Sequence, residues 1–226
     1  FMEKPLSNKL EHLDRLEKEI HKNKVAFYTA YCLRFHPVIQ KIKRLLANKK
    51  IYHSRIVCSS YLPHWRPGQA HKNNYSAMAK FGGGVFLDMS HEFDYIEYLF
   101  GPIASMVGQL DRLTEITVDV EDVADILITS RNGIKINLHL DYVSRLYERT
   151  VKIDFEGGYL VGDLLHGRIT FAVGKNVKQL TLTVDKDTIF KEQLNYFLKN
   201  LKNSDIMNNF TDSKVFIEKL LRFKKA

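Results

Sequence analysis

The sequence predicts an α+β fold: an open, mainly antiparallel β-sheet with helices on one face. Apolar residues recur at helical spacing near both ends of the chain, whereas between 103 and 184 they alternate with polar residues at every second position. With 226 residues, the chain is also long enough to bury a sizeable core. These observations together favour helices packed against a wide sheet.

The composition is that of a folded globular protein, with 45% hydrophobic and 27% charged residues. No apolar run approaches the roughly 18 residues that a membrane span needs, so we expect no membrane partner. Cys32 and Cys58 are too few for a disulfide framework. The polar first residues lack the apolar stretch of a secretory signal, and we therefore expect a cytoplasmic protein.

The first elements are expected in the order helix, strand, helix. Four apolar residues at helical spacing predict a helix that is capped by Ser7 or Asn8 and ends before Asn23. Residues that favour strands predict a strand over 25–31, and the apolar residues Ile39, Ile42, Leu45 and Leu46 predict a second helix after Pro37.

A strand expected over 51–61 leads into a long polar loop that ends at Gly82-Gly83-Gly84. The loop is longer than usual connections, which makes it a candidate functional loop. The glycines lack the Gly-Lys-Ser/Thr ending of a phosphate-binding loop, so they are expected to permit a close approach of backbone to a ligand or another segment. The most hydrophobic helix of the chain is expected over 85–100.

Short alternating runs at 123–128, 134–140 and 150–155 predict an antiparallel meander. Such a sheet packs one face on helices and leaves the other face free. A free face on so wide a sheet is a natural subunit interface, so we expect a homo-oligomer that associates through it. Two further helices are expected in the C-terminal tail.

The helix expected over 85–100 carries the first candidate chemistry, because Asp88, His91, Tyr95 and Tyr98 fall on one of its stripes. A carboxylate three residues from an imidazole can orient it or stabilise its charge, as a general acid–base near neutral pH requires. The alternative is structural: the helix dipole favours Asp88 in the first turn, and His91 is then a hydrogen-bonded core histidine. Asp94 lies off the stripe, as a tether or a substrate contact.

The polar loop combines the only tryptophan of the chain with cations and amides. Aromatic stacking and forked hydrogen bonds suit the recognition of sugars or phosphates, so the candidate substrate-binding residues are Trp65, Arg66, Lys72 and Tyr75. A solvated loop anchored by a buried tryptophan is the alternative. The histidines and cysteines show no recognised ligand spacing, so no metal site is expected.

The 34 Lys and Arg residues outnumber the 26 Asp and Glu residues, giving a net charge of +8. This charge favours anionic partners at long range. No helix-turn-helix, zinc-finger or RNA-recognition signature accompanies the basic helical faces, so a nucleic-acid partner is not expected. A basic nucleic-acid-binding protein nevertheless stays an alternative.

Three patterns occur in order: Glu3-Lys4-Pro5, Tyr31-Cys32-Leu33-Arg34-Phe35-His36-Pro37, and the stretch from Gly82 to Asp94. Together they resemble the Gfo/Idh/MocA family of nicotinamide-dependent dehydrogenases, and the resemblance spans nearly the whole chain. The loop over 61–75 and the Asp-Met-Ser-His-Glu stretch look most like members of bacterial surface-sugar pathways such as nonulosonate synthesis. The resemblance therefore implies a sugar, amino-sugar or nucleotide-sugar substrate.

The resemblance implies hydride transfer at a sugar carbon with NAD or NADP. His91 matches the catalytic histidine, which accepts the proton during oxidation, and Lys4 matches the lysine that reaches the reacting hydroxyl. Asp88 would be the acidic partner of His91, and Glu3, Lys4 and Pro5 would contact the cofactor.

Two residues depart from the family pattern. The family's aspartate stands four residues before the histidine, whereas Asp88 stands three before His91. Cys32 replaces an asparagine that is common in the second pattern.

The resemblance also implies two domains. Residues 1–36 would be the last part of a dinucleotide-binding Rossmann domain, and 37–226 a substrate-binding and oligomerisation domain whose C-terminal helix packs back on the first. The sequence holds no G-x-G-x-x-G turn, so we expect a domain of roughly 120 residues to lie outside this chain. The chain alone should then not bind NAD(P) tightly. A truncated sugar-binding and oligomerisation module without redox activity is the alternative.

Overall fold

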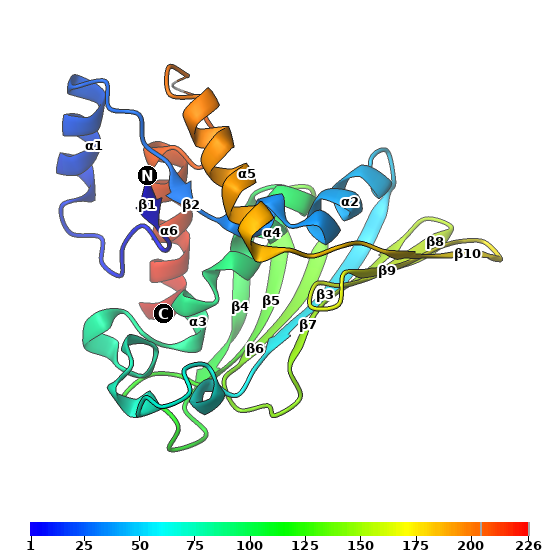
Figure 1. Ribbon diagram of the computed structural model, residues 1–226, viewed down its shortest axis with the longest axis horizontal. Helices are drawn as coiled ribbons and strands as arrows, with labels where there is room; N and C mark the ends of the chain where they lie inside the picture. The colour runs from blue at the N-terminus through cyan, green and yellow to red at the C-terminus, as the bar shows by residue number, and fades with distance from the viewer. Residues whose placement is uncertain (204, 226) are drawn as a thin grey trace. The chain divides into compact units, whose positions relative to one another are not determined.

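The computed structural model describes residues 1–203 and 205–225. They form two compact units. The terminal unit combines Phe1–Cys32 with the residues from Lys186 onward, and the sheet unit comprises Leu33–Asp185. The elements of both units are labelled in Figure 1.

The terminal unit is built on a short pair of parallel strands. β1 (Met2–Glu3) pairs with β2 (Thr29–Ala30), so that Met2 lies opposite Thr29. Three helices complete the unit: α1 (Leu13–Lys22), α5 (Lys186–Lys199) and α6 (Phe210–Lys225).

Helices α1 and α6 of the terminal unit come from opposite ends of the sequence and contact each other. The ammonium of Lys214 on α6 donates to Glu17 at 2.7 Å and also to Asp14, both on α1. Phe27 packs edge-on against Phe210, with the ring centroids 5.0 Å apart. The terminal unit therefore forms only when both ends of the chain fold together.

The first helix begins later than the sequence predicts. α1 starts at Leu13 because the hydroxyl of Ser7 accepts a hydrogen bond from the Lys9 amide at 3.0 Å, which closes a turn instead of capping a helix. His12 precedes the helix with a left-handed φ of 66°. The strand predicted over 25–31 is confirmed only at Thr29–Ala30.

An eight-stranded sheet forms the sheet unit, in the order β10-β9-β8-β7-β3-β6-β5-β4. Its strands are β3 (Ile51–Ser59), β4 (Ile103–Asp111), β5 (Val123–Ser130), β6 (Lys135–Asp141), β7 (Glu148–Phe155), β8 (Gly158–Asp163), β9 (Arg168–Val173) and β10 (Asn176–Thr181). The neighbouring strands are antiparallel, apart from the parallel pair β3 and β6. The predicted open, mainly antiparallel sheet is confirmed.

The predicted meander is interrupted, because β3 lies between β6 and β7 although it precedes both in the sequence. Ile56 and Cys58 of β3 are almost completely buried, which suits a strand in the middle of the sheet. Alternating runs that follow one another in the sequence predict pairing between consecutive strands. They do not show that a strand from earlier in the sequence lies between two of them.

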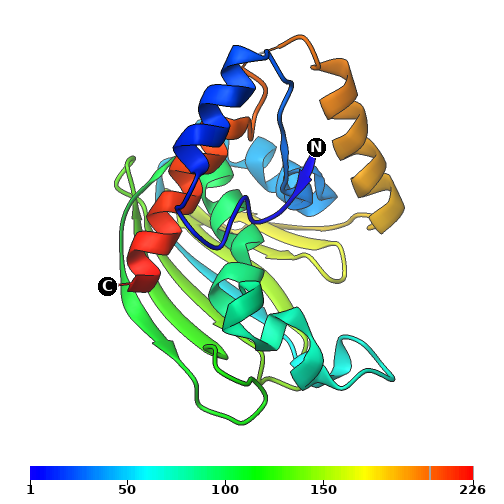
Figure 2. The ribbon, with the colours of Figure 1, turned by 90° about the vertical axis from the view of Figure 1, so that its left-hand side faces the viewer.

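Helices of the sheet unit lie on one face of this sheet, as Figures 1 and 2 show: α2 (Pro37–Leu45), α3 (Val85–Asp88) and α4 (Ser90–Phe100). α2 lies very close to β8 at Gly162, where a Cβ atom would stand 2.7 Å from Cδ1 of Ile42. Glycine therefore permits the close packing of helix on strand.

The opposite face of the sheet mixes charged and apolar side chains. Val107 and Leu127 are 69% and 60% exposed, and Arg55 lies beside Lys152 in register. His139 contacts Asp125 at 2.7 Å and Asp141 at 3.2 Å. The hydrogen bond to Asp141, with the contributions of Asp125, raises the pKa of His139 to about 9, so this face carries an imidazolium at neutral pH.

Candidate functional site

The helix predicted over 85–100 is in fact two helices. α3 ends at Asp88 and α4 begins at Ser90, with Met89 at φ −89° and ψ 27° between them. The amide of Glu92 bonds to the Met89 carbonyl three residues back, so the helical register changes at this point. Asp88 and His91 therefore do not share one continuous helical stripe, which corrects the expected arrangement.

Gly83 and Gly84 have no Cβ atom, and this allows neighbouring groups to lie close to the start of α3. A Cβ atom on Gly83 would lie 2.3 Å from the Tyr75 carbonyl oxygen, and one on Gly84 would lie 2.2 Å from Oε1 of Glu121. Gly84 also has a φ of 103°, a conformation that favours glycine. The expected close backbone approach is confirmed at Gly83, where the approaching segment is the polar loop, whereas at Gly84 the approaching group is the side chain of Glu121.

Three hydroxyl groups hold the carboxylate of Asp88. Ser76 donates to Oδ2 at 2.6 Å, Tyr142 donates to Oδ2 at 2.9 Å, and Tyr75 donates to Oδ1 at 3.3 Å. Asp88 is only 7% exposed, and burial together with the Asp88 charge raises the pKa of the Tyr142 hydroxyl well above its ordinary value. Tyr142 therefore stays a hydrogen-bond donor to this carboxylate over the whole physiological pH range.

His91 lies in the first turn of α4 and is half-buried. The two tyrosines expected on its stripe serve the structure instead. Tyr95 is fully buried, and Tyr98 accepts a hydrogen bond from Gln40 at 3.1 Å while Lys43 stacks over its ring. Asp88 and His91, the acid–base pair that the sequence predicts, lie on either side of the break at Met89.

Three of the four predicted loop residues contact the surroundings of Asp88. The indole N–H of Trp65 donates to Ser60 at 3.0 Å, and the indole packs edge-on against Tyr142 at 5.2 Å. Arg66 donates to Asn74 at 2.5 Å, and its guanidinium lies 4.9 Å from the ring centroid of Tyr75. Tyr142 and Tyr75 are two of the residues that hold Asp88, so the loop and the buried carboxylate form one network. Lys72 is exposed and joins none of these hydrogen bonds.

The carboxylate of Asp94 binds Arg34, which belongs to the second sequence pattern. Nε and Nη2 of Arg34 donate to its two carboxylate oxygens at 2.9 and 2.8 Å. Burial raises the pKa of the Asp94 carboxyl to about 6, against the opposing charge of Arg34. Asp94 therefore tethers α4 to Arg34, and a tether is one of the two roles that the sequence suggested for this residue.

A second buried pair lies on the other side of α4. Arg149 of β7 donates to Glu92 at 2.6 Å, and the Glu92 side chain is completely buried. His36, whose Nδ1 accepts from the Val38 amide at the start of α2, lies near this guanidinium. Burial, and then the charge of Arg149, lowers the pKa of His36 to about 4. These groups join α2, α4 and β7.

Glu3, Lys4 and Pro5 lie in the terminal unit, at the carboxyl end of β1. Tyr31 directly follows the parallel partner β2. Ligands of open parallel sheets bind outside the carboxyl ends of the strands. The predicted cofactor contacts therefore stand at the carboxyl end of this strand pair.

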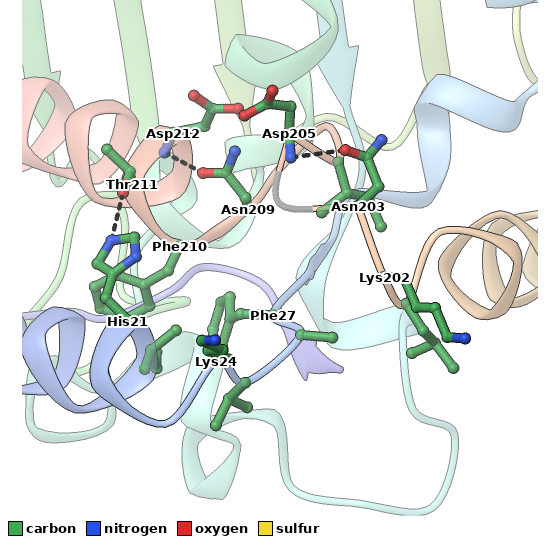
Figure 3. A pocket seen from close by; sticks show the side chains of 15 residues that line it. His21, Lys24, Phe27, Lys202, Asn203, Asp205, Asn209, Phe210, Thr211 and Asp212 are labelled. Carbon is green, nitrogen blue, oxygen red and sulfur yellow. Dashed lines mark hydrogen bonds between the residues drawn. The ribbon is translucent and has the colours of Figure 1, made fainter.

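The terminal unit also contains a cavity of about 820 Å³, which Figure 3 shows from close by. Its polar side chains already serve neighbouring backbone groups: Asn203 accepts from the Asp205 amide and Asn209 from the Asp212 amide, both at 2.9 Å. None of the predicted site residues lines it.

Sequence reasoning missed residues that only the fold brings to the site. Ser76 and Tyr142 hold Asp88, yet Tyr142 follows β6, far from Asp88 in the sequence. A tyrosine next to a strand end is a weak signal, because most such residues only pack. Among residues 1–203 and 205–225, no group of histidine, cysteine and acidic side chains could hold a metal ion, and no helix is long and apolar enough to span a membrane.

The comparisons with known proteins agree with this fold. The family described as GFO/IDH/MocA C-terminal domain matches residues 39–161. An oxidoreductase of Synechocystis is 26% identical over 83% of this chain and 56% of its own length. The chain thus spans little more than half of that relative.

Two solved structures are similar over almost the whole chain. UDP-N-acetylglucosamine 3-dehydrogenase from Acidithiobacillus ferrooxidans has a TM-score of 0.78 at 18% identity, covering 100% of this chain and 69% of its own. The WlbA dehydrogenase from Bordetella pertussis, solved with NADH and UDP-GlcNAcA, has a TM-score of 0.74 at 17% identity, covering 99% and 69%. These likenesses establish the fold, and the family match over more than half of the residues establishes that the chain belongs to the Gfo/Idh/MocA oxidoreductase family.

Proposed function

We propose that this chain supplies the substrate side of an NAD(P)-dependent oxidoreductase, which transfers a hydride between a nicotinamide cofactor and a hydroxyl of a sugar or sugar derivative. One observation carries the proposal: a buried carboxylate, Asp88, is held by three hydroxyls three residues before the half-buried His91, in a chain of a dehydrogenase family. This arrangement suits a general acid–base that acts on an alcohol.

The cofactor side of the proposal rests on the terminal unit. β1 and β2 are two parallel strands, and parallel sheets normally have more strands and helices on both faces. Residues 1–36 are therefore proposed as the last part of a dinucleotide-binding domain and 37–226 as the substrate domain, whose C-terminal helix α6 packs back on α1 of the first part and so belongs to the terminal unit. Glu3, Lys4 and Pro5, at the carboxyl end of β1, suit contacts to a nicotinamide.

A nicotinamide cofactor, when bound, would supply the hydride acceptor for the oxidation of the sugar carbon. His91 takes the proton of the hydroxyl as the carbonyl forms, and returns a proton to the oxygen in the reverse direction. Lys4 polarises the reacting oxygen. Asp88 orients the imidazole or stabilises its charge once the proton has arrived, and Ser76, Tyr75 and Tyr142 keep the Asp88 carboxylate in place.

The substrate class is proposed from the loop. Trp65, Arg66 and Tyr75 form a surface of aromatic rings and a guanidinium beside the Asp88 network, which suits a sugar with an anionic group. One structural neighbour is named for UDP-N-acetylglucosamine, which makes a nucleotide-linked sugar the first candidate. Asp94 is assigned to holding Arg34 rather than to the substrate.

The partner proposed for the open face of the sheet is a second copy of this chain. Exposed Val107 and Leu127 lie on this face next to charged residues of both signs. A self-complementary face of this kind suits a two-fold interface.

The test is turnover in the full-length parent protein that includes a dinucleotide-binding domain. His91→Ala should lower kcat by about 10²–10⁴-fold, the usual contribution of a general acid–base, with the fold unchanged. His166→Ala, which changes an exposed histidine in the β8–β9 turn, is the matched control and should have no effect. Turnover of His91→Ala within threefold of wild type would rule out this assignment.

A separate titration tests the cofactor assignment. The 226-residue chain alone should show no tight, saturable binding of NADH or NADPH by fluorescence, because the pyrophosphate-binding turn is not in its sequence. Tight binding would mean that the terminal unit by itself holds the cofactor. A sugar-binding module without redox activity would bind sugars normally but show no His91-dependent turnover in any form of the protein.

A further inference from the structure

A second cluster of aromatic and cationic side chains lies beside the loop network. The guanidinium carbon of Arg145 stands 4.2 Å from the ring centroid of Tyr61, and its Nη2 donates to the Tyr61 hydroxyl at 3.1 Å. His64 packs edge-on against the same ring, at 4.8 Å between centroids. Tyr61 thus orients two nitrogen-bearing side chains at once.

The topology explains why these residues meet. Tyr61 and His64 follow β3, and Arg145 follows β6, and these two strands are the parallel pair of the sheet. The pairing continues beyond the strand ends, because the amides of Ser60 and Leu62 donate to the carbonyls of Asp141 and Tyr142 at 3.1 and 3.0 Å. The carboxyl ends of these two parallel strands meet at one edge of the sheet, which brings the segments that follow them together.

The turn that carries Arg145 is held on both sides. Oδ1 of Asp141 accepts hydrogen bonds from the amides of Val143 and Ser144, at 2.8 and 2.5 Å. The Ser144 hydroxyl donates to the Leu146 carbonyl at 3.0 Å. A guanidinium on such a turn, stacked on a ring, loses little conformational freedom when it binds a ligand.

The residues that the structure describes do not neutralise the charge of Arg145. Among the residues that the structure describes, no carboxylate forms an ion pair with it, unlike Arg34 with Asp94 and Arg149 with Glu92. Beyond it, Leu146 and Tyr147 are 72% and 62% exposed, which offers an apolar surface next to the cation. An oriented, unneutralised guanidinium with an exposed aromatic neighbour suits an anion that carries a planar ring.

We propose that Arg145, supported by Tyr61 and assisted by His64, binds the diphosphate of a nucleotide-linked sugar substrate. The guanidinium fork matches two phosphate oxygens, and the base would lie against Tyr147. The cluster adjoins the catalytic network: Trp65 donates to Ser60, next to Tyr61, and packs on Tyr142, which holds Asp88. This inference rests on the proposed function for the substrate class.

The test is calorimetric binding to the 226-residue chain with four probes: UDP, UDP-N-acetylglucosamine, N-acetylglucosamine and NADH. Arg145→Gln removes the charge and leaves a shorter, neutral polar side chain. It should weaken UDP and UDP-N-acetylglucosamine by about tenfold or more and leave N-acetylglucosamine unchanged. Arg145→Lys should recover part of the affinity, because it restores the charge without the fork. Arg131→Gln, with the same charge change in the turn at the opposite end of β6, is the control and should bind like wild type.

Three results would overturn the proposal: no UDP binding by the wild-type chain at millimolar concentrations, UDP affinity of Arg145→Gln within twofold of wild type, or an effect of Arg145→Gln on NADH but not on UDP. The last result would assign the cluster to the cofactor's pyrophosphate. The binding test does not depend on turnover, so it can fail while His91 proves catalytic, and it can succeed when the His91 assignment fails.

Discussion

Two kinds of buried carboxylate stand close together around α4. Asp88, before the helix, is held by the hydroxyls of Tyr75, Ser76 and Tyr142, which are neutral donors. Glu92 and Asp94, within the helix, are each held by a guanidinium, from Arg149 and Arg34. The same side-chain chemistry is therefore placed in two different electrostatic settings.

The difference indicates two roles. A buried ion pair fixes two elements together, and removing one member leaves an uncompensated charge in the interior. A carboxylate held by hydroxyls keeps its geometry but is not matched to an opposite charge by those donors, so its charge can act on a neighbouring imidazole. We therefore expect changes at the ion pairs to affect stability, and changes at Asp88 to affect catalysis.

The largest expected effect on stability comes from Arg149→Met, which leaves Glu92 buried without its guanidinium. The free energy of unfolding should fall by about 3–5 kcal/mol, measured by urea denaturation of the chain. Lys152→Met, on the exposed face of the same strand, is the control and should change it by about 0.5 kcal/mol or less. A loss of less than about 1 kcal/mol in Arg149→Met would remove the distinction between the two kinds of carboxylate.

The next-largest expected effect is a pH dependence of the free energy of unfolding. It arises from His36, which lies near the ion pair of Arg149 and Glu92. The pKa of His36 is lowered from 6.5 to about 4 in the folded protein, so the unfolded chain binds more protons between these values. Stability should therefore fall by about 3 kcal/mol through this group as the pH decreases from 6.5 to 4.

His36→Asn tests this, because asparagine keeps a hydrogen-bond acceptor at the start of α2 but does not titrate. Urea denaturation at both pH values should show a smaller acid loss in the variant, whereas exposed His12→Asn should behave like wild type. Arg149→Met should also shrink the loss, since removing that charge raises the pKa of His36. An unchanged acid loss in His36→Asn would contradict the assignment.

A smaller effect on stability is expected from changes in the hydroxyl groups that bind Asp88. Tyr142→Phe removes one hydrogen bond to a charged group and should cost about 2 kcal/mol of unfolding free energy. Tyr159→Phe, at a half-exposed tyrosine on β8, should cost almost nothing. If Tyr142→Phe were as damaging as Arg149→Met, Asp88 would belong with the structural carboxylates.

Local patterns predicted much of this architecture. Alternation predicted the strands of the sheet from β5 to β7, and Pro37 with the apolar residues after it predicted α2. The central place of β3 was not predicted, because pairing between strands distant in the sequence leaves no periodic trace. The break at Met89 was also missed, since the apolar pattern on either side fits one helix.

The candidate site was predictable where function depends on residues close in the sequence. Asp88 and His91 stand in one motif, and Trp65, Arg66 and Tyr75 stand in one loop. Tyr142 and Arg145 reach the same region only because β6 lies parallel to β3, so neither could be recognised without the sheet. The sequence offered Asp94 as a tether, but it did not identify the partner, because Arg34 lies 60 residues away.

The most direct test of the two roles compares Asp88→Asn with Asp94→Asn in a protein that contains this chain and the proposed dinucleotide-binding domain, measuring kcat and the free energy of unfolding for both. Asp88→Asn should lower kcat by about 100-fold or more while stability changes by about 1 kcal/mol or less, because the hydroxyls can still bond to an amide. Asp94→Asn should keep kcat within about threefold and lose about 2–3 kcal/mol, because Arg34 loses its carboxylate. The opposite pattern, with Asp94→Asn inactive and Asp88→Asn fully active, would contradict the assignment of Asp88 and His91 as the catalytic pair.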